Sequence, residues 1–333
     1  MQSTVDVAMR LRAKAVNVAE RRFLLTVLTG SRQEADLSEP VNCGGVGRVR
    51  HFRRDQSEGW PLNPLPIDPS AKALGIAAAP ELRAQVFQNA VCNWRCWYCF
   101  VPFELLAGRE AHSVWLEAPE LVERYLSETD RAALVDLSGG QPDLVPEWVP
   151  WMMDALEAAG VESSTYLWSD DNLSNDYFWR FLSPRQIDRI AAYPAYGKVC
   201  CFKGFDAESF AFNTSAPPDL FATQFDLFRR LADLGLDLYA YVTLTTPSVD
   251  GVGRKVGLLV DQLQAIHPML PLRTVPLHVV SWGPVHDRLT PARRKALEHQ
   301  WAAVESWQQE LERRFTSVER ATNIASLPRP GDQ

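Results

Sequence analysis

From about residue 83 onward, short apolar runs alternate with longer segments in which apolar residues recur every three or four positions. Runs of the first kind are typical of buried strands, and segments of the second kind are typical of amphipathic helices. Strands are predicted at 84–91, 133–138, 162–168, 198–203, 237–245 and 275–282. Helices are predicted near 119–128, 147–159, 175–192, 218–234 and 254–266, and a longer one at 291–315.

This alternation predicts an α/β fold in which parallel strands are joined through helices by right-handed crossovers. Six strand–helix units are too few for a closed eightfold barrel. We therefore expect an open, partial (β/α)6 barrel over residues 81–288. A C-terminal amphipathic helix and tail, residues 289–333, would follow it.

Residues 1–80 are expected to form an N-terminal extension to the barrel. A helical pattern near 5–28 opens it, and a proline-rich run, Pro61, Pro64, Pro66 and Pro69, comes near its end. Proline at this density disfavours both helix and sheet. The run therefore predicts a loop, or a strap laid over another surface.

Composition limits the function classes. Lysine and arginine number 34 against 41 aspartates and glutamates, a net charge of −7, which argues against a nucleic-acid partner. No apolar run reaches the length of a transmembrane helix, about 18 residues or more, so no membrane partner is expected. The N-terminus lacks the apolar core of a signal peptide. A cytoplasmic location is therefore expected.

The six cysteines are unevenly distributed: three at 92, 96 and 99, two adjacent at 200 and 201, and one at 43. A chain this large and this poor in cysteine does not look like a secreted disulfide scaffold. In a reducing compartment, clustered thiols indicate metal or redox chemistry.

Cys92, Cys96 and Cys99 follow the first predicted barrel strand and can converge on one metal centre. Thiolates hold iron–sulfur cubes, and three of them leave one iron open to chelate an amino and a carboxylate group. One alternative is a structural zinc site, although zinc usually takes four ligands and the nearest histidine, His112, lies thirteen residues beyond Cys99. The other alternative is inert, buried cysteine.

The spacing Cys-x3-Cys-x2-Cys, with an aromatic residue before the last cysteine, resembles the signature of the radical S-adenosylmethionine (SAM) superfamily. The resemblance implies a partial barrel of the radical SAM type. It implies a [4Fe–4S] cluster on Cys92, Cys96 and Cys99, and SAM at the open iron. In that family the aromatic residue, here Tyr98, packs near the SAM adenine.

Ser138-Gly139-Gly140-Gln141 and the proline after it, at the end of the second predicted strand, resemble the Gly-Gly-Glu-Pro motif of that family. Paired glycines let the backbone approach a ligand closely, and the motif binds the SAM amino group. Gln141 replaces the glutamate, which keeps the backbone contacts and removes a charge. On its own, Gly-Gly after a strand is usually only a turn.

Ser169, Asp171 and Asn172 end the third predicted strand. Polar residues at the carboxyl ends of barrel strands line the active-site face, and the resemblance assigns this level to the SAM ribose. The same residue types also serve as helix N-caps, and the two roles are compatible.

Cys200, Cys201 and Lys203 end the fourth predicted strand. The segment resembles the branch that contains the pyruvate formate-lyase activating enzyme, in which a lysine points into the barrel. Because alternate strand residues share a face, Cys201 and Lys203 should point together and Cys200 should point away. Lys203 would pair with a carboxylate of substrate or SAM; alternatively, it would reach solvent.

Cys-Cys-x-Lys-Gly also resembles radical SAM enzymes of organoarsenical (arsinothricin) biosynthesis. Cys43 would then complete a three-thiolate arsenic site with Cys200 and Cys201, or the three would hold an auxiliary cluster. Packing in a core strand is the alternative.

The implied function is reductive cleavage of SAM to a radical that modifies a small-molecule or peptide substrate, with Lys203, Cys201 and Cys200 as candidate catalytic residues. An electron donor such as flavodoxin or ferredoxin would be the protein partner. One alternative enzyme transfers the 3-amino-3-carboxypropyl group of SAM to arsenite. An alternative from another class is a zinc-stabilised binding protein without turnover.

Overall fold

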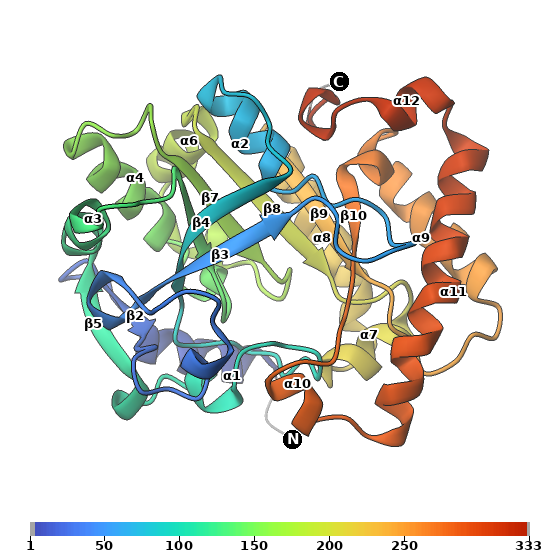
Figure 1. Ribbon diagram of the computed structural model, residues 1–333, viewed down its shortest axis with the longest axis horizontal. Coiled ribbons are helices and arrows are strands. Elements are labelled where there is room, and N and C mark those ends of the chain that lie inside the picture. The colour runs from blue at the N-terminus through green and yellow to red at the C-terminus, as the bar shows by residue number, and fades with distance from the viewer. Residues whose placement is uncertain (1–3, 332–333) are drawn as a thin grey trace.

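A curled, seven-stranded sheet runs through the middle of the computed structural model, which describes residues 4–331 (Figure 1). Six of its strands are parallel and neighbour one another in chain order. They are β4 (Glu81–Gln88), β6 (Leu134–Ser138), β7 (Tyr166–Asp171), β8 (Tyr196–Phe202), β9 (Leu238–Thr243) and β10 (Thr274–Leu277). This arrangement confirms the predicted α/β fold with an open, partial barrel.

The seventh strand, β3 (Gly47–Arg53), pairs antiparallel with β4 and forms the edge of the sheet opposite β10. The sequence pattern did not predict it. Its residues, GRVRHFR, include four basic side chains and no regular alternation of polar and apolar residues, a weak strand signal by itself. Pairing with the buried strand β4 decides its conformation. A segment of the first eighty residues is thus part of the main sheet.

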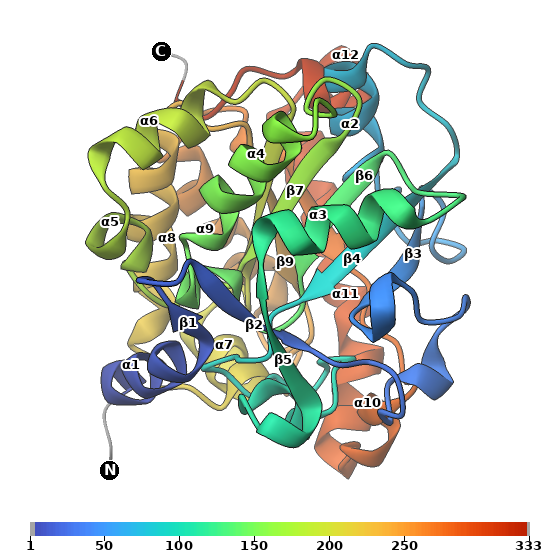
Figure 2. The ribbon, with the colours of Figure 1, turned by 90° about the vertical axis from the view of Figure 1, so that its left-hand side faces the viewer.

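The predicted helix at 5–28 is wrong beyond residue 15. Helix α1 (Thr4–Ala15) is followed by β1 (Val16–Asn17) and β2 (Arg22–Thr26). Strand β2 also pairs with β5 (Ser113–Glu117), which gives a second sheet of three antiparallel strands (Figure 2). The long-range pairing of β2 with β5 overrides the local helical periodicity, because it buries the apolar residues of β2.

Helices follow the strands and cover the outer face of the barrel sheet (Figures 1 and 2). They are α3 (Ala118–Ser127), α4 (Trp148–Ala158), α5 (Tyr177–Phe181), α6 (Pro184–Ala192), α8 (Leu220–Ala232) and α9 (Val252–Gln264). Helix α7 (Ala207–Thr214) instead lies at the carboxyl ends of the strands, where the N–H of Trp97 donates to the carbonyl of Asn213 at 3.2 Å. The single helix expected at 175–192 is two helices. Ser183 ends the first stretch because it caps α6 in a capping box with Gln186.

The proline-rich loop, residues 54–66, crosses from β3 to the strands at the other edge of the sheet. Trp60 donates its indole N–H to the carbonyl of Pro276 in β10 at 3.1 Å. The amide of Asn63 donates to the Tyr241 hydroxyl of β9 at 3.1 Å. This segment, which we call the strap, therefore covers part of the barrel interior, as one of the two sequence interpretations proposed. Pro69 lies in the first turn of helix α2 (Ile67–Leu74), where proline is tolerated.

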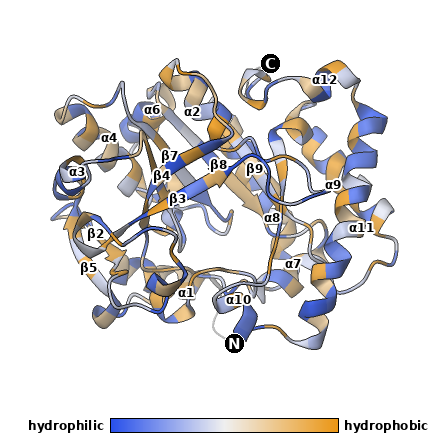
Figure 3. Cartoon of the chain, in the orientation of Figure 1, coloured by the Kyte–Doolittle hydropathy of each residue, from blue (hydrophilic) through white to orange (hydrophobic). Residues whose placement is uncertain are grey.

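At the C-terminus, α10 (Pro284–Asp287) precedes the long helix α11 (Pro291–Arg314) and α12 (Ser317–Ala321). Val304 and Trp307 of the predicted apolar stripe are buried, and Arg314 is ion-paired with Asp261 of α9 at 2.6 Å. In α11, hydrophobic residues alternate with hydrophilic ones, so that the helix has an apolar side toward the barrel and a polar outer side (Figure 3). Within residues 4–331, no helix has the length and apolarity needed to cross a bilayer.

Candidate active site at the carboxyl ends of the strands

The three clustered cysteines lie on an irregular loop, residues 89–101, directly after β4. Hydrogen bonds hold this cysteine loop at its start: the N–H of Cys92 donates to the carbonyl of Leu106 at 3.1 Å. The N–H of Gln141, just after β6, donates to the carbonyl of Val91 at 2.7 Å. The loop is therefore fixed to the carboxyl end of the neighbouring strand. Cys92 is buried, and Cys96 and Cys99 are half-buried.

Cationic side chains surround the three thiols. Burial raises the pKa of each thiol, and that of Cys96 to about 12, whereas the charge of Lys203 acts on all three in the opposite direction. Arg95 donates to the carbonyls of Cys92 and Trp94, so its guanidinium lies within the same loop. This positively charged environment favours the thiolate form of the three cysteines, which is the form that binds a metal centre.

No three His, Cys, Asp or Glu side chains among residues 4–331 are arranged as ligands of a single metal ion. A [4Fe–4S] cube does not require its ligands to converge on one ion, because each thiolate binds its own iron at a separate corner of the cube. Three free thiols on one loop, with positive charge around them, have the donor chemistry that such a cluster needs.

The two glycines after β6 allow the cysteine loop to pack against it. Both have positive φ angles, +73° at Gly139 and +60° at Gly140. A Cβ on Gly140 would lie 2.4 Å from the carbonyl oxygen of Asn89 and 2.5 Å from that of Val91. We expected a side chain here to enter the space of a ligand; in the structure it would instead collide with the backbone of the cysteine loop.

The side chain of Gln141, one of the residues expected to contact SAM, is hydrogen-bonded to other residues of the protein. Its Nε2 donates to Asp171 at 2.7 Å, and its Oε1 accepts from the N–H of Asn172 at 2.9 Å. Asp171 in turn accepts from the N–H of Leu173. Gln141 and Asp171 thus join the ends of β6 and β7, and the expectation that their side chains bind SAM does not fit this geometry. Asn172 does face the cysteine loop, with its amide 3.8 Å from the Cys92 sulfur.

On β7, Ser169, one of the predicted ligand contacts, lies on the outer face of the strand. The Ser169 hydroxyl is completely buried against the hydroxyl of Tyr196, at 2.7 Å, on the outer side of the sheet. Asp170, which was passed over, points to the interior and accepts from Ser138 at 2.5 Å. Adjacent strand residues face opposite sides, so an error of one position moves the assignment across the sheet. Ser138 itself faces the interior, as expected of a candidate ligand contact.

Cys201 and Lys203 lie beside Tyr98 of the cysteine loop. The Tyr98 hydroxyl lies 3.0 Å from the Thr243 hydroxyl at the end of β9. Burial acts to lower the pKa of Lys203, but Cys201, Tyr98 and Cys96 outweigh it, so the pKa is raised and the ammonium is retained. Cys201 and Lys203 therefore share a face, and both lie next to the cysteine loop.

Cys200 faces the other way. It shares a side of β8 with Phe202, whose ring stacks on Phe225 of α8 at 4.9 Å, so this side is the outer, helix-covered one. The groups that act on its pKa, after burial itself, include Asp171 and Lys198. Cys200 is therefore a core residue, and its candidate catalytic role does not fit the structure.

Cys43 is remote from the other two cysteines of the proposed arsenic or auxiliary site. Its N–H donates to Glu128 at 2.7 Å, next to α3, and Glu128 and Arg124 are the charged groups that act on its pKa. With Cys200 and Cys201 on opposite faces of β8, the three thiols do not form one site. The three-thiolate hypothesis is wrong for this structure.

No protein-family model matches the sequence, and no curated protein matches it either. Among solved structures, SuiB from Streptococcus suis bound to S-adenosylmethionine is similar, with a TM-score of 0.38 and 17% identity. SuiB bound to its precursor peptide SuiA gives 0.36 and 13%. Both matches cover 53% of this chain, but only 37% and 36% of SuiB, so the chain matches little more than a third of its length. Similarity at this level carries no inference about substrates.

Proposed function

We propose that this protein is a radical SAM enzyme whose [4Fe–4S] cluster is bound by Cys92, Cys96 and Cys99. One observation carries the proposal: the three thiols lie on the loop after β4, at the carboxyl edge of an open parallel barrel. They adjoin the Gly139–Gly140 turn and Lys203, which directly follows β8. Active sites of α/β barrels are built at this edge.

When bound, the cluster and SAM supply the reductive cleavage and the carbon-centred radical. The chain provides the surroundings. Backbone groups at Gly139 and Gly140, together with Ser138 and Asn172, border the space beside the cysteine loop where SAM would bind. Asp170, also on the interior, replaces Ser169 and Asp171 as the candidate for the ribose hydroxyls. Burial of the site excludes water, which protects a reactive radical.

Lys203 and Cys201 are the proposed substrate-side residues. Lys203 holds a positive charge next to Cys96 and Tyr98, where it can bind a carboxylate of substrate or SAM. Cys201 presents a thiol to the same interior region. The proposed substrate is a small molecule or a peptide, and a flavodoxin or ferredoxin would supply the electron.

The test is anaerobic reconstitution with iron and sulfide. Wild-type protein should take up about four irons per chain and convert SAM with a reductant to 5′-deoxyadenosine. Cys96→Ala should lose most of the iron and all cleavage. Cys43→Ala, which removes a buried thiol outside the site, is the matched control and should retain both.

Each other outcome supports a different function. Methylthioadenosine in place of 5′-deoxyadenosine would support 3-amino-3-carboxypropyl transfer instead. Zinc in place of iron, with no SAM cleavage, would support a binding protein without turnover. Full iron uptake and normal cleavage by Cys96→Ala would overturn the cluster assignment.

A further inference from the structure

A cavity of about 470 Å³ opens along β3, where the sheet is not closed. Its walls come from both edges of the barrel and from the cysteine loop. Arg48 and Arg50 belong to β3, Trp282 follows β10, and Phe100 directly follows Cys99. The rings of Phe100 and Trp282 stack, with centroids 6.1 Å apart. The cavity therefore leads from the surface toward the proposed active site.

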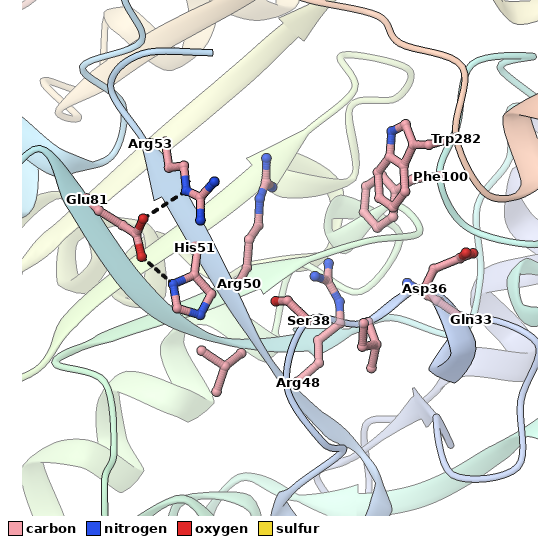
Figure 4. A pocket seen from close by; sticks show the side chains of 12 residues that line it. Gln33, Asp36, Ser38, Arg48, Arg50, His51, Arg53, Glu81, Phe100 and Trp282 are labelled. Carbon is pink, nitrogen blue, oxygen red and sulfur yellow. Dashed lines mark hydrogen bonds and ion pairs between the residues drawn. The ribbon is translucent and has the colours of Figure 1, made fainter. Parts of the chain in front are cut away.

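Arg48 is a buried cation whose hydrogen-bond donors are incompletely paired within residues 4–331. Its side chain is 5% exposed, and neither Nε nor Nη2 has a hydrogen-bond partner among the described residues. Its guanidinium lies 5.1 Å from the centroid of the Phe100 ring. Figure 4 shows Arg48 and Arg50 extending from β3 on the side of the Phe100 and Trp282 rings, while His51 turns away toward Glu81.

Asp136 of β6 is the complementary buried group. It is fully buried, and neither carboxylate oxygen has a hydrogen-bond partner in residues 4–331. Burial and the neighbouring Asp170 raise its pKa, whereas Arg50 and Arg48 act to lower it. Arg48 pairs with Val86 of β4, and Val86 pairs with Asp136 of β6, so Arg48 and Asp136 lie on the same face of the sheet with β4 between them. The donors and acceptors named here are unsatisfied. An unsatisfied buried polar group is costly and rare in a native protein.

We infer that Arg48 and Asp136 form a substrate subsite that binds an amino-acid group: a free carboxylate on Arg48 and a protonated amine on Asp136. The inference rests on the proposed function and specifies its substrate class. A guanidinium presents paired N–H donors that match a carboxylate, and a buried carboxylate favours a cationic donor. A zwitterion would satisfy both groups at once and add no net charge to the interior.

Arg53 provides an internal contrast. It lines the same cavity, but its side chain is 68% exposed and ion-paired with Glu81 at 2.8 Å. Its charge is therefore already compensated, and it has no orphaned donor to offer a substrate. Arg53→Gln is accordingly the matched control for Arg48→Gln.

The experiment uses the reconstituted full-length protein with SAM, and calorimetric titration with the standard amino acids. Each is compared with its amide, which lacks the carboxylate, and its N-acetyl form, which lacks the amine. At least one free amino acid should bind wild-type protein, with its amide and N-acetyl forms about tenfold weaker or more, a loss of about 1.4 kcal/mol. Arg48→Gln and Asp136→Asn should weaken binding at least as much, and Arg53→Gln should leave it unchanged.

SAM binding and 5′-deoxyadenosine formation are measured in the same preparations. If SAM is cleaved but no free amino acid binds the wild type, or if the blocked derivatives bind equally well, this inference fails and the proposed function stands. If SAM is not cleaved, the proposed function fails. If a variant loses iron or unfolds, the inference is tested on the wild-type protein alone, by comparing the binding of free amino acids with that of their amide and N-acetyl forms. Weakened SAM binding in Arg48→Gln would assign the subsite to SAM and overturn the inference.

Discussion

Gln141 donates a hydrogen bond from its side-chain amide to the carboxylate of Asp171 at 2.7 Å, between the ends of β6 and β7. The Oε1 atom of the same amide accepts the N–H of Asn172 at 2.9 Å. Gln141 is 1% exposed, so both bonds are shielded from water. The replacement of glutamate by glutamine in this motif therefore has a structural reason: a glutamate here would place a second carboxylate against Asp171.

Gln141→Glu should destabilise the apoprotein. The variant keeps an acceptor for Asn172 but loses the donor to Asp171, and we expect a loss of about 1–3 kcal/mol in the free energy of unfolding at pH 8. Repulsion and burial would raise the folded-state pKa of the new carboxyl above its unfolded value. The loss should therefore grow as pH rises above the unfolded value and shrink toward pH 5. Urea unfolding at the two pH values measures this.

Gln141→Leu provides the comparison. It also removes the donor but adds no charge, so its loss of stability should not depend on pH in this way. Equal losses at pH 5 and pH 8 for Gln141→Glu would show that the carboxylate of Asp171 does not feel the substitution.

The paired glycines should differ in their tolerance of alanine. A Cβ at Gly140 would meet two backbone carbonyl oxygens of the cysteine loop, which cannot move without displacing that loop. A Cβ at Gly139 would meet the side chain of Gln88 at 2.6 Å, which can shift. Gly140→Ala should therefore lower the melting temperature and iron uptake far more than Gly139→Ala does.

Gly160→Ala isolates the backbone contribution. Its φ is +69°, and an added Cβ would meet nothing within 4 Å, so only the cost of the left-handed conformation, about 1 kcal/mol, applies. Gly140→Ala with the same small effect as Gly160→Ala would contradict the close packing of the cysteine loop on β6.

The sequence predicted the six parallel strands because short strand-like segments alternate with helical patterns along the chain. Strands β2, β3 and β5 escaped it for a common reason. Strand β2 lies within a helical periodicity, and β3 is rich in arginine; both become strands through partners far away in sequence, β5 and β4. Local patterns do not report such pairings.

At the site, motif spacing identified the cysteine loop and the glycine turn, but not which face of a strand each residue takes. Asp170 was missed next to two chosen residues, because assigning a face requires a register exact to one position. Arg48 and Asp136 were also missed. The β3 arginines carried no motif, and Asp136 was one polar residue in an apolar run. Its burial without a partner is visible only in the folded protein.

Lys198 and Asp143 form a buried ion pair on the outer side of the sheet, 2.8 Å apart, with side chains 0% and 4% exposed. Lys198→Met should cost about 3–5 kcal/mol of unfolding free energy at pH 8, because it leaves the Asp143 carboxyl buried and uncompensated. The pKa of Asp143 is already raised to about 7, by burial first and then by Asp171. Adding Asp143→Leu should recover most of the loss. A single variant as stable as wild type in urea would refute the prediction.

The stabilisation from His51 should decline with rising pH. Its ring nitrogens lie 2.5 Å from Glu81 and 2.6 Å from Glu39, and these bonds, that to Glu81 first, raise its pKa. A raised folded-state pKa means that the stabilisation is complete below the unfolded value, about 6.5, and is lost as pH rises through the folded value. The advantage of wild type over His51→Gln, at most about 1 kcal/mol for so exposed a pair, should therefore be larger at pH 6 than at pH 9. An advantage that grows with pH would show that the ring is neutral in this contact.

Lys203 should set the reduction potential of the proposed cluster. Its charge acts on Cys92, Cys96 and Cys99, and a nearby cation stabilises the reduced, more negative cluster. Lys203→Met should therefore shift the midpoint potential to more negative values, on the order of tens of millivolts. Lys203→Arg keeps the charge and should stay near wild type. Redox titration followed by electron paramagnetic resonance measures the shift at matched iron content. An unchanged midpoint potential in a fully loaded Lys203→Met protein would contradict this prediction. If that protein also lost SAM turnover, Lys203 would be identified as a residue that only binds ligands.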